Sequence, residues 1–564
     1  MLIASRERPA AAGGSALQRY RQVAAVLMKH GLADVVDALH LGRYLAAGTR
    51  LLPAPSRIDP SLSRSARLRL TFEELGPTFV KFGQALSVRS DVLPAELIEE
   101  LAKLQDATTP LPAGTAAATV EAAFGQPISD LFRSFDPVPL AAASMAEVHG
   151  AELPSGERVV VKVRRPGIAR VISSDVEILR QLAHLIERHL PGATAVGPVA
   201  LVDEFARTIR AEQDFQREGH NIERCARNFE GDPTVRMPRV IWNRTTRNVL
   251  TLEYLDGWKI SELAASGLGP DERRLLARRG ADAMLAQILL HGFFHADPHP
   301  GNLLVLPGFV IGFLDFGIVG RIDGPMRTAL TKIVRAVWHR DVEELARLAV
   351  EISQPAVDVD MRALGQDLSG LLDAYTDLPL GELSMTEVLT EIVATAARHH
   401  LRIPSHLMLL IKAVVTIEGV GRQLDPDFKI VEHAAPLAER LWRVESSPRA
   451  VAGRVSQRIQ DTVEAAQRLP AHLDAIGRKV RDGRLEIQFV HRNLDHFVRE
   501  MDRSSNRLSF AIVIGSLVVA SSVVIQSGIG GTIAGYPALG LAGFVIAGVL
   551  GIGLAIGIVR SGRL

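Results

Sequence analysis

The segment HADPHPGNLLVLPGFVIGFLDFG, from His295 to Gly317, contains polar residues whose types and order suit phosphoryl transfer. Asp297 is followed after five positions by Asn302 and after eighteen positions by Asp315. Phosphoryl transfer needs one carboxylate that orients or deprotonates the attacking group, and an amide and a second carboxylate that hold the metal bridging the phosphates. The spacing therefore predicts that Asp297 acts on the attacking group and that Asn302 and Asp315 bind Mg2+.

Two short apolar runs, 303–306 and 309–314, predict a β-hairpin that places these polar residues at one rim. Two other interpretations stay open. His295 and His299 flank Asp297 at a spacing that would suit zinc, although two neighbouring prolines disfavour the helix that would align the imidazoles. The segment could also be a polar loop in which Asp and Asn serve only the turn.

The composition limits the possible folds and partners. The chain has 564 residues, enough for a large core and roughly three to four domains. Its formal net charge of +1 predicts no global attraction to nucleic acid, and no nucleic-acid partner is expected. The single cysteine, Cys225, excludes a disulfide framework and is expected to be a small core residue in a reducing compartment. The N-terminus lacks the apolar core of a signal peptide.

The C-terminal region is the longest apolar part of the chain. No charged residue occurs for 52 positions after Arg507, and residues 508–529 and 538–559 are each long enough to span a bilayer. We predict a transmembrane hairpin, with a buried helical hairpin in a soluble core as the alternative. Flanking arginines predict that both termini and the catalytic body are cytoplasmic. A GxxxG pair, Gly553 and Gly557, predicts close helix contact within the hairpin or between the chains of a homodimer.

A strand upstream carries a lysine that could bind phosphate. The alternation from Glu157 to Val163 predicts this strand, with Lys162 near its end, as in the kinase strand whose lysine contacts the α- and β-phosphates. The preceding loop is rich in alanine where a kinase has glycine, so we expect a stiff loop whose backbone N–H groups still cradle phosphate. The ATP-contacting residues expected there are Leu140, Ala141, Ala142, Ala143, Ser144, Met145 and Ala146.

Two further segments complete a nucleotide site of this kind. A helical segment carries Glu218, which we expect to pair with Lys162 and to fix its position. An apolar strand then leads into a hinge, where backbone groups of Glu253 and Leu255 would meet the adenine. The predicted catalytic residues are therefore Asp297, Lys162 and Glu218.

Some residues do not belong to an ordinary kinase pattern. Residues 64–108 predict helices that carry Lys81 and Gln84, which are three positions apart and so share a helical face. Glu212 and Asp214 are acids that an ordinary kinase does not require. Taken singly, each of these features would indicate only a solvated helix surface.

The complete set of motifs resembles the ABC1/ADCK/UbiB family of atypical kinase-like proteins. The resemblance covers about residues 64–430, and the segment 404–428 is similar to the C-lobe helix of that family. The hydrophobic hairpin is similar to that of the bacterial members. The motifs are KFGQ (81–84), AAAS (141–144), VVVKV (159–163), EQDFQRE (212–218), HADPHPGN (295–302) and LDFG (314–317).

The resemblance implies an α+β, protein-kinase-like two-lobed fold with an added N-terminal helical KxGQ element and a C-terminal transmembrane helical hairpin. The expected parts are a peripheral helical arm (1–60), the KxGQ helical extension (61–110), the N-lobe (111–258), the C-lobe (259–430), a helical linker (431–506) and the hairpin (507–564).

In this family the KxGQ segment folds over the active site. Carried over to this chain, the resemblance implies that Lys81, Gly83 and Gln84 lie against Glu212 and Asp214, where a peptide substrate would otherwise bind. Such an arrangement argues against phosphorylation of proteins.

The chain departs from the family at Glu147, because the family usually has Gln after the alanine-rich loop. The departure implies an added negative charge near the phosphates. That charge could weaken nucleotide binding or bring in a second cation, and the two alternatives stay open.

The resemblance also implies a membrane-anchored ATPase or atypical kinase with ATP and Mg2+ as cofactors, acting in ubiquinone biosynthesis by ATP-driven handling of polyprenyl-lipid precursors. The expected location is the bacterial inner membrane. The expected partners are a membrane lipid or quinone precursor and a quinone-biosynthesis enzyme complex. The alternatives are a true small-molecule or lipid kinase and a pseudoenzyme scaffold for a membrane biosynthetic complex.

Overall fold

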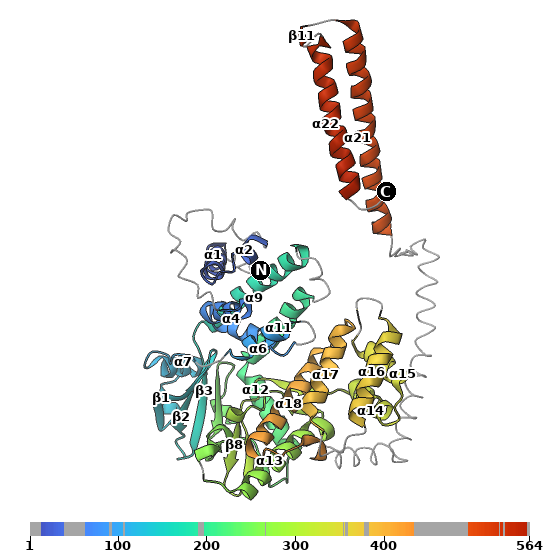
Figure 1. Cartoon of the computed structure of the whole chain (residues 1–564). Coiled ribbons are helices and arrows are strands. Elements are labelled where there is room, and N and C mark those ends of the chain that lie inside the picture. The colour runs from blue at the N-terminus through green and yellow to red at the C-terminus, as the bar shows by residue number, and fades with distance from the viewer. Residues whose placement is uncertain are drawn as a thin grey trace, which may run out of the picture. The chain divides into compact units, whose positions relative to one another are not determined.

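The computed structural model (Figure 1) forms two compact units, Met1–Val451 and Ala452–Leu564, and each is described by itself. The predicted linker 431–506 lies mostly outside the described residues. The structure describes residues 13–38, 62–89, 93–104, 108–189, 197–265, 267–353, 355, 359–376, 383–433, 494–528, 531–533 and 536–560.

A four-stranded antiparallel sheet forms the smaller lobe of the first unit (Figure 1). Alternation along strand β3 buries Val159, Val161 and Val163 on one face, where they pack with helix α7. Lys162 therefore lies on the opposite face. In spatial order the strands are β1 (Ser134–Ala142), β2 (Ala146–Glu152), β3 (Arg158–Arg164) and β5 (Val249–Glu253), with α7 (Thr115–Phe124) and α8 (Ile128–Leu131) beside them.

Three helices, α9, α11 and α12, follow β3 in the chain, and α12 packs against β5. Asp214 caps α12, because its side chain accepts a hydrogen bond from the Gln216 N–H at 3.2 Å. Cys225 on α12 is fully buried, which confirms that it is a core residue. The helices are α9 (Ile168–His189), α11 (Pro198–Glu212) and α12 (Phe215–Asn228).

The larger lobe is built around helices α13 and α18, which pack on each other. Strands β8 and β9 pair from Leu303↔Phe313 to Leu306↔Val310, which confirms the predicted hairpin. A second sheet orders its strands β4-β9-β8-β6, and β7 pairs separately with β10. The strands are β4 (Val235–Arg236), β6 (Trp258–Lys259), β7 (Phe293–His295), β8 (Leu303–Leu306), β9 (Val310–Phe313) and β10 (Val319–Arg321).

The larger lobe is mainly helical. Its α-helices are α13 (Pro270–Leu285), α14 (Gly324–Trp338), α15 (Val342–Ser353), α16 (Met361–Thr376), α17 (Met385–Arg398) and α18 (Ser405–Leu424). Shorter turns of helix between the strands and helices of this unit are η1 (Trp242–Arg244), η2 (Ile260–Ala265), η4 (Pro300–Asn302) and the π-helical segment η3 (Ala286–Leu290).

The N-terminal helices share one apolar cluster with α9 and α11. Gly83 on α5 is needed for this packing, because a Cβ there would overlap Leu104 and lie 2.8 Å from Phe72 Cδ2. The cluster fixes α5 beside α11. These helices are α1 (Gly13–Lys29), α2 (Ala33–Ala38), α4 (Arg64–Leu75), α5 (Pro77–Leu86) and α6 (Ala95–Ala102).

The second unit is a pair of apolar helices, α21 (Leu494–Ser527) and α22 (Ala538–Arg560), joined by strands β11 (Thr532–Ile533) and β12 (Tyr536–Pro537). The windows Ser505–Ser527 and Ala538–Ala555 have mean hydropathies of 2.5 and 2.3, and most of their surface is exposed. Both helices are therefore long and apolar enough to cross a membrane.

The two apolar helices meet at glycines near the start of α22. A Cβ at Gly540 would overlap Ile525, and one at Gly543 would overlap Ser521. Gly553 of the predicted GxxxG pair has no atom within 4 Å of where its Cβ would be. The expectation that Gly553 makes a close contact within the hairpin is therefore wrong, because the helices approach one another at other glycines.

Candidate active site

Lys162 and Glu218 form the innermost ion pair of the first unit. The Nζ of Lys162 lies 2.8 Å and 3.0 Å from the two carboxylate oxygens of Glu218, which stands in the first turn of α12. The Glu218 side chain is only 3% exposed. Lys162 Nζ also lies 3.3 Å from Asp315 Oδ1, so one ammonium group connects strand β3, helix α12 and the DFG segment that follows β9.

The charges of these three groups influence one another. Burial by itself would lower the pKa of Lys162, but the charges of Asp315 and Glu218 outweigh it and raise that pKa. Burial raises the pKa of Glu218 to about 7, against the opposing charge of Lys162. Desolvation by the surrounding protein would raise the pKa of Asp315. The charges of Lys162 and Lys81 outweigh that effect and hold the pKa of Asp315 below its usual value. Asp315 therefore stays ionised and suited to a cation.

The backbone at Asp315 has a φ of 53°, in the left-handed region that residues other than glycine seldom adopt. Its Oδ1 accepts a hydrogen bond from the Gly317 N–H at 3.2 Å. Asn221 on α12 donates to the Phe316 carbonyl at 3.1 Å and so holds the same turn from the other side. A strained backbone held by surrounding contacts is typical of a functional position.

His295 organises the loop that carries Asp297. Its Nδ1 accepts from the Asp297 N–H at 3.1 Å, so the proton is on Nε2, which donates to the Leu314 carbonyl at 2.7 Å. Burial lowers the pKa of His295 and favours this neutral form. Both ring nitrogens are therefore occupied by structural hydrogen bonds.

The zinc interpretation is wrong. Besides His295, the second candidate ligand, His299, uses its Nδ1 to accept from the Gly301 N–H at 3.1 Å. Across the described ranges, no group of three His, Cys, Asp or Glu side chains is arranged to hold a metal ion.

Asp297 is bound by a lysine that the motif analysis missed. Lys412 on α18 places its Nζ 2.8 Å from Asp297 Oδ1, and each side chain is 32% exposed. Asn302 donates from Nδ2 to the Asp297 backbone carbonyl at 3.2 Å. One signal could have found this lysine: Lys412 is the single charged residue in the apolar run between His406 and Glu418.

The lysine of the KFGQ segment reaches the site from α5. Lys81 Nζ lies 2.9 Å from Glu212 Oε1, the last residue of α11, and both side chains are mostly covered. Gln84 makes a different contact from the expected one, because its Nε2 donates to the Leu104 carbonyl at 3.1 Å. It forms no hydrogen bond to either expected acid.

The expected contact of Asp214 with the KFGQ segment is also wrong. Asp214 caps α12 and lies 3.3 Å from Arg247 Nε. Helix α11 ends at Glu212 and α12 begins at Phe215, so the two acids do not lie on one continuous helix. The break directs Glu212 toward Lys81 and Asp214 toward the outer surface.

A cavity of about 850 Å³ connects these side chains. Asp297, Asn302 and Asp315 line one part of it, together with Lys81, Glu212 and Lys412. The remaining lining is largely apolar and comes mainly from α5, α6, α11 and α18, although it also contains the charged residues Arg89 and Glu204. Its apolar residues include Phe82, Leu86, Leu101, Leu104, Leu201, Phe205, Ile209, Ile318, Met408 and Leu409.

Comparison with known proteins identifies the architecture. A model described as the ABC1 atypical kinase-like domain matches residues 103–349, the UbiB helical domain matches 368–429, and the ABC1/UbiB kinase-like C-terminal domain matches 492–560. The chain is 36% identical over 522 residues to a protein named "Probable protein kinase UbiB" from Xanthomonas euvesicatoria, covering 90% of this chain and 93% of the relative. The chain belongs to the ABC1/UbiB family.

A second relative supports the same family membership. A protein of the same name from Xylella fastidiosa is 34% identical over 517 residues, with the same two coverages. The solved complex of Rv3197 with erythromycin from Mycobacterium tuberculosis covers 63% of this chain and 94% of that chain, with 23% identity and a TM-score of 0.42. Family membership makes the first unit a kinase-like domain.

The residues of this family member fit Mg2+ bound together with a nucleotide. Asn302 uses its Nδ2 for the Asp297 carbonyl, which leaves the amide oxygen for a metal. The Asp315 side chain is half exposed and held ionised. Mg2+ prefers one or two protein oxygens completed by phosphate and water, and these two residues could supply them.

The alanine-rich loop is shorter than the sequence predicts. Residues 140–142 belong to β1 and Ala146 to β2, so the turn contains only residues 143–145. The Ala143 N–H donates to the Ala146 carbonyl at 2.9 Å and is unavailable to phosphate. The Ala143 carbonyl accepts from Arg165 Nε and Thr108 Oγ1, both at 2.9 Å, which ties the turn to the chain leading from α6.

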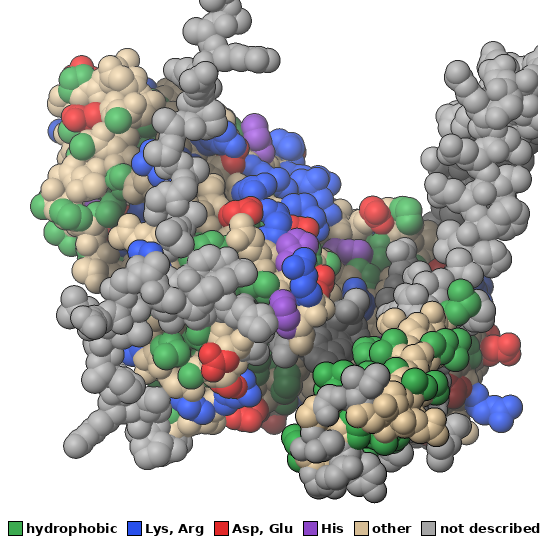
Figure 2. Space-filling model, turned by 90° about the horizontal axis from the view of Figure 1, so that it is seen from above, with side chains coloured by type: hydrophobic (Ala, Val, Ile, Leu, Met, Phe, Trp, Pro, Cys, Tyr) green, Lys and Arg blue, Asp and Glu red, His purple; other side chains and the backbone are tan. Residues whose placement is uncertain are grey.

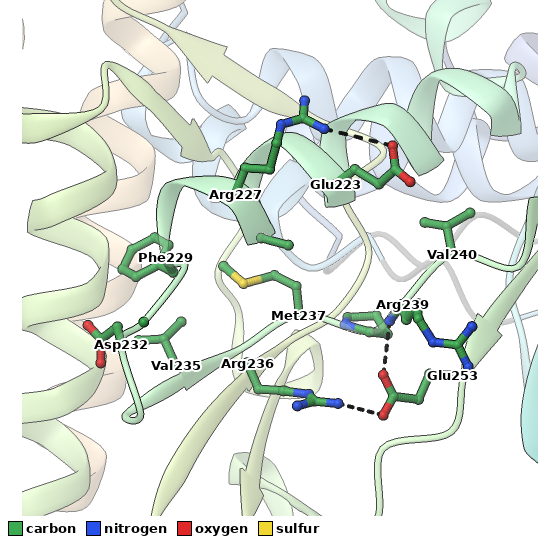
Figure 3. A pocket seen from close by; sticks show the side chains of 13 residues that line it. Glu223, Arg227, Phe229, Asp232, Val235, Arg236, Met237, Arg239, Val240 and Glu253 are labelled. Carbon is green, nitrogen blue, oxygen red and sulfur yellow. Dashed lines mark hydrogen bonds and ion pairs between the residues drawn. The ribbon is translucent and has the colours of Figure 1, made fainter.

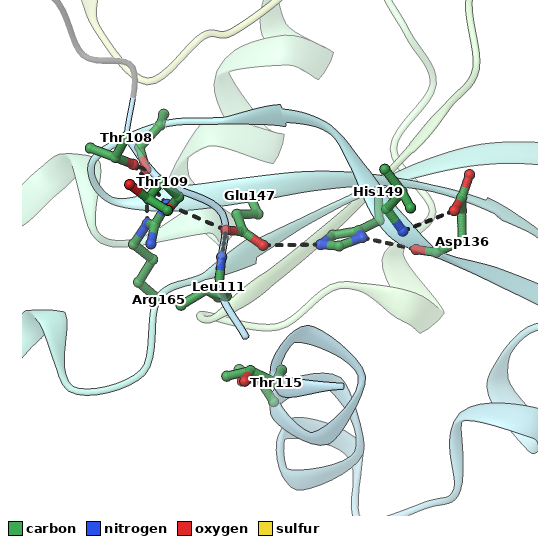
Figure 4. A network of polar contacts seen from close by, with 11 residues as sticks. Thr108, Thr109, Leu111, Thr115, Asp136, Glu147, His149 and Arg165 are labelled. Atoms are coloured by element: carbon green, nitrogen blue, oxygen red, sulfur yellow. Dashed lines mark hydrogen bonds and ion pairs between the residues drawn. The ribbon is translucent and has the colours of Figure 1, made fainter. Parts of the chain in front are cut away.

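Glu147, where the family usually has Gln, is buried in the network that Figure 4 shows. Its Oε1 accepts from the Leu111 N–H and lies 3.3 Å from Arg165 Nη2, and its Oε2 lies 3.4 Å from His149 Nε2. This carboxylate is enclosed and paired within the smaller lobe, so an effect of its charge on the phosphates stays a prediction.

One backbone group of the predicted hinge is already occupied. The Glu253 N–H donates to the Arg239 carbonyl at 2.9 Å, so this amide cannot meet the adenine, whereas Leu255 follows the strand. The Glu253 carboxylate binds Arg236 at 2.7 Å and the Arg239 N–H at 3.1 Å. These groups line the separate 480 Å³ pocket in Figure 3, whose lining includes none of the predicted catalytic residues.

Proposed function

We propose that this protein is a membrane-anchored, kinase-like ATPase that uses ATP to handle a polyprenyl lipid, most specifically a quinone precursor of ubiquinone biosynthesis. The observation that carries the proposal is the composition of the 850 Å³ cavity, which joins phosphoryl-transfer side chains to a long apolar wall. An amphiphile with a polar head and an apolar tail matches both parts. The resemblance to the ABC1/UbiB family supplies the ubiquinone context.

Each predicted site residue would have a separate role in binding or hydrolysing ATP. Lys162, held by Glu218, would contact the α- and β-phosphates. Mg2+, when bound at Asn302 and Asp315, would bridge the phosphates and neutralise part of their charge. Asp297 would orient an attacking water or hydroxyl group and accept its proton.

The Lys81–Glu212 ion pair supports a substrate other than a peptide. The pair joins α5 to α11, and both residues line the cavity beside Asp297. An extended peptide would have to displace these covered charges, whereas an apolar chain could lie along the neighbouring leucine and phenylalanine side chains. We therefore place a lipid tail, rather than a protein segment, in this space.

The apolar hairpin of the second unit would anchor the protein in the bacterial inner membrane. Arg507 and Arg560 flank its apolar helices, and positive residues are retained on the cytoplasmic side. ATP is available on that side. The kinase-like unit also carries a group of Lys and Arg side chains on the face in Figure 2, which suits work near anionic lipid headgroups. Exposed arginines on α9 and α11 include Arg188, Arg207 and Arg210.

The test is ATP turnover by the full-length protein in liposomes with and without a polyprenylated phenol. We expect Mg2+-dependent phosphate release that the phenol increases, and Asp315→Asn should lower release at least about 100-fold. Lys332→Met, a change on the distant helix α14, is the matched control and should leave turnover unchanged. Turnover that survives in Asp315→Asn would contradict the assignment.

A true lipid kinase is the second candidate, favoured by the same cavity because Asp297 faces the space where a lipid hydroxyl could lie. ATP labelled at the γ-phosphate separates the two functions. Label recovered as free phosphate supports the ATPase, whereas label in the lipid fraction supports the kinase. A protein that neither binds nor hydrolyses ATP would be a scaffold.

A further inference from the structure

Lys412 contacts Asp297, the residue predicted to act on the attacking group. Its Nζ is 2.8 Å from Asp297 Oδ1, and both side chains line the cavity with Asp315. In the part of the chain that the structure describes, this is the one ion pair that Lys412 makes. Asp297 Oδ2 has no partner among the same residues, so the carboxylate can hold Lys412 with one oxygen and accept a proton with the other.

The position of Lys412 in its helix argues against a purely structural role. It is the single charged residue between His406 and Glu418, in the helix that packs on α13. A charge in an apolar stretch is costly unless it is satisfied. Its pair with Asp297 is one-third exposed, and pairs of this kind contribute little to stability. The lysine therefore has a better explanation in the chemistry of the cavity.

The other two lysines of the site are held elsewhere. Lys162 is fixed between Glu218 and Asp315, where it suits the α- and β-phosphates. Lys81 is held at 2.9 Å by Glu212. Lys412 is the lysine that contacts the predicted base itself.

We propose that Lys412 is a catalytic cation that contacts the transferred phosphoryl group and stabilises its developing charge. The proposal rests on the proposed function. In the step, the attacking oxygen forms a bond to the γ-phosphorus, and the bond from that phosphorus to the β–γ bridging oxygen breaks. The electron pair stays on the ADP oxygen and the proton of the attacking group passes to Asp297. Lys412 keeps its proton throughout and donates hydrogen bonds to the phosphoryl oxygens.

The experiment compares Lys412→Met and Lys412→Arg in full-length protein in liposomes of phosphatidylethanolamine and phosphatidylglycerol. We expect Lys412→Met to lower kcat for ATP about 100-fold with KM changed less than about threefold, because the contact strengthens in the transition state. Lys412→Arg should recover part of the loss, because it keeps the charge. Lys332→Met, outside the cavity lining, is the control, and a thermal unfolding scan checks that Lys412→Met folds.

A double variant separates a direct contact from an effect through Asp297. If Lys412 touches the phosphoryl group, Asp297→Asn with Lys412→Met should turn over ATP at least about tenfold more slowly than Asp297→Asn alone. Equal rates would show that Lys412 only positions Asp297 and would overturn the proposal. An unchanged kcat in Lys412→Met overturns it as well. Failure of the proposed function gives a different result, because the wild-type protein would then show no Asp315-dependent turnover.

Discussion

The Lys162–Glu218 and Lys81–Glu212 ion pairs are chemically alike, with shortest distances of 2.8 Å and 2.9 Å. Both lysines are less than one-fifth exposed. The pairs differ in what they connect. The first joins a strand and a helix of the smaller lobe, beside Asp315. The second joins α5 to the end of α11 and lines the cavity.

This difference indicates that the two ion pairs have different roles, although their chemistry is the same. A lysine held beside Asp315 is suited to phosphate, and its loss should affect chemistry first. A lysine that connects two helices along a cavity wall is suited to closing that space, and its loss should affect stability and access first. Substitutions in the two pairs should therefore have different consequences.

The largest effect is expected from Lys162→Met. Loss of the ammonium group removes the phosphate contact and leaves the buried carboxylate of Glu218 without its partner, so kcat/KM for ATP should fall at least about 100-fold. The measurement is steady-state phosphate release by the full-length protein. Lys259→Met, a partly exposed site on β6, is the control. If kcat/KM for ATP fell equally in Lys162→Met and Lys81→Met, the distinction between the two pairs would be lost.

The pH dependence tests the acid of the first pair. Because burial raises the pKa of Glu218 to about 7, its ionised form gains population as pH rises through that value. Only the ionised form can hold Lys162 as a salt bridge. We therefore expect kcat/KM for ATP to fall as pH decreases through about 7.

The control for this profile is Glu218→Gln, which has no carboxyl to titrate. It should lower the plateau about tenfold or more and remove the acidic limb assigned to Glu218. An acidic limb of the same midpoint in Glu218→Gln would assign the titration to another group, such as the nucleotide.

The second pair is tested by stability. Lys81→Met leaves Glu212 mostly covered and unpaired, so it should lower the free energy of unfolding by about 1–3 kcal/mol while kcat for ATP stays within about threefold. Glu212→Gln should have a similar effect. The double variant should cost less than the sum of the two, with a coupling of at least about 0.5 kcal/mol. Denaturant unfolding of the four proteins measures this coupling, and strict additivity would mean that the pair does not act as a unit.

Local sequence patterns predicted the elements that carry the Lys162–Glu218 pair, but they did not predict the Lys412–Asp297 contact. Alternation in β3 and the helical pattern around Glu218 are short-range signals, and the hairpin between Asn302 and Asp315 has a clear turn. These elements bring Lys162 to Glu218 and Asp315, whereas the roles of the three residues stay predictions. The Lys412–Asp297 contact joins positions far apart in the chain and depends on how α18 packs on α13, which no local pattern contains.

Two departures from the predicted site have specific physical causes. The resemblance implies a shared task for Glu212 and Asp214, but the helix boundary between them separates their directions. Backbone groups of Glu253 were expected to meet the adenine, whereas the N–H of this residue already donates to the Arg239 carbonyl. The first departure concerns where a helix ends, and the second concerns a hydrogen bond that the backbone has already made.

The smallest effect is expected at Glu147, which contacts neither pair in the described structure. Glu147→Gln keeps an oxygen that can accept from the Leu111 N–H, although it removes the charge beside Arg165. Because Gln has nearly the same shape, the free energy of unfolding should change by less than about 1.5 kcal/mol, and kcat for ATP should stay within about twofold. Glu147→Ala, which loses the acceptor as well, should destabilise the protein by about 1–3 kcal/mol because the partly buried Leu111 N–H is left unpaired. Paired measurements of unfolding and ATP turnover on both variants decide the point. A change of tenfold or more in the KM for ATP in Glu147→Gln would mean that this carboxylate acts on the nucleotide after all, and the division between a phosphate-binding pair and a closing pair would then need a third charged group.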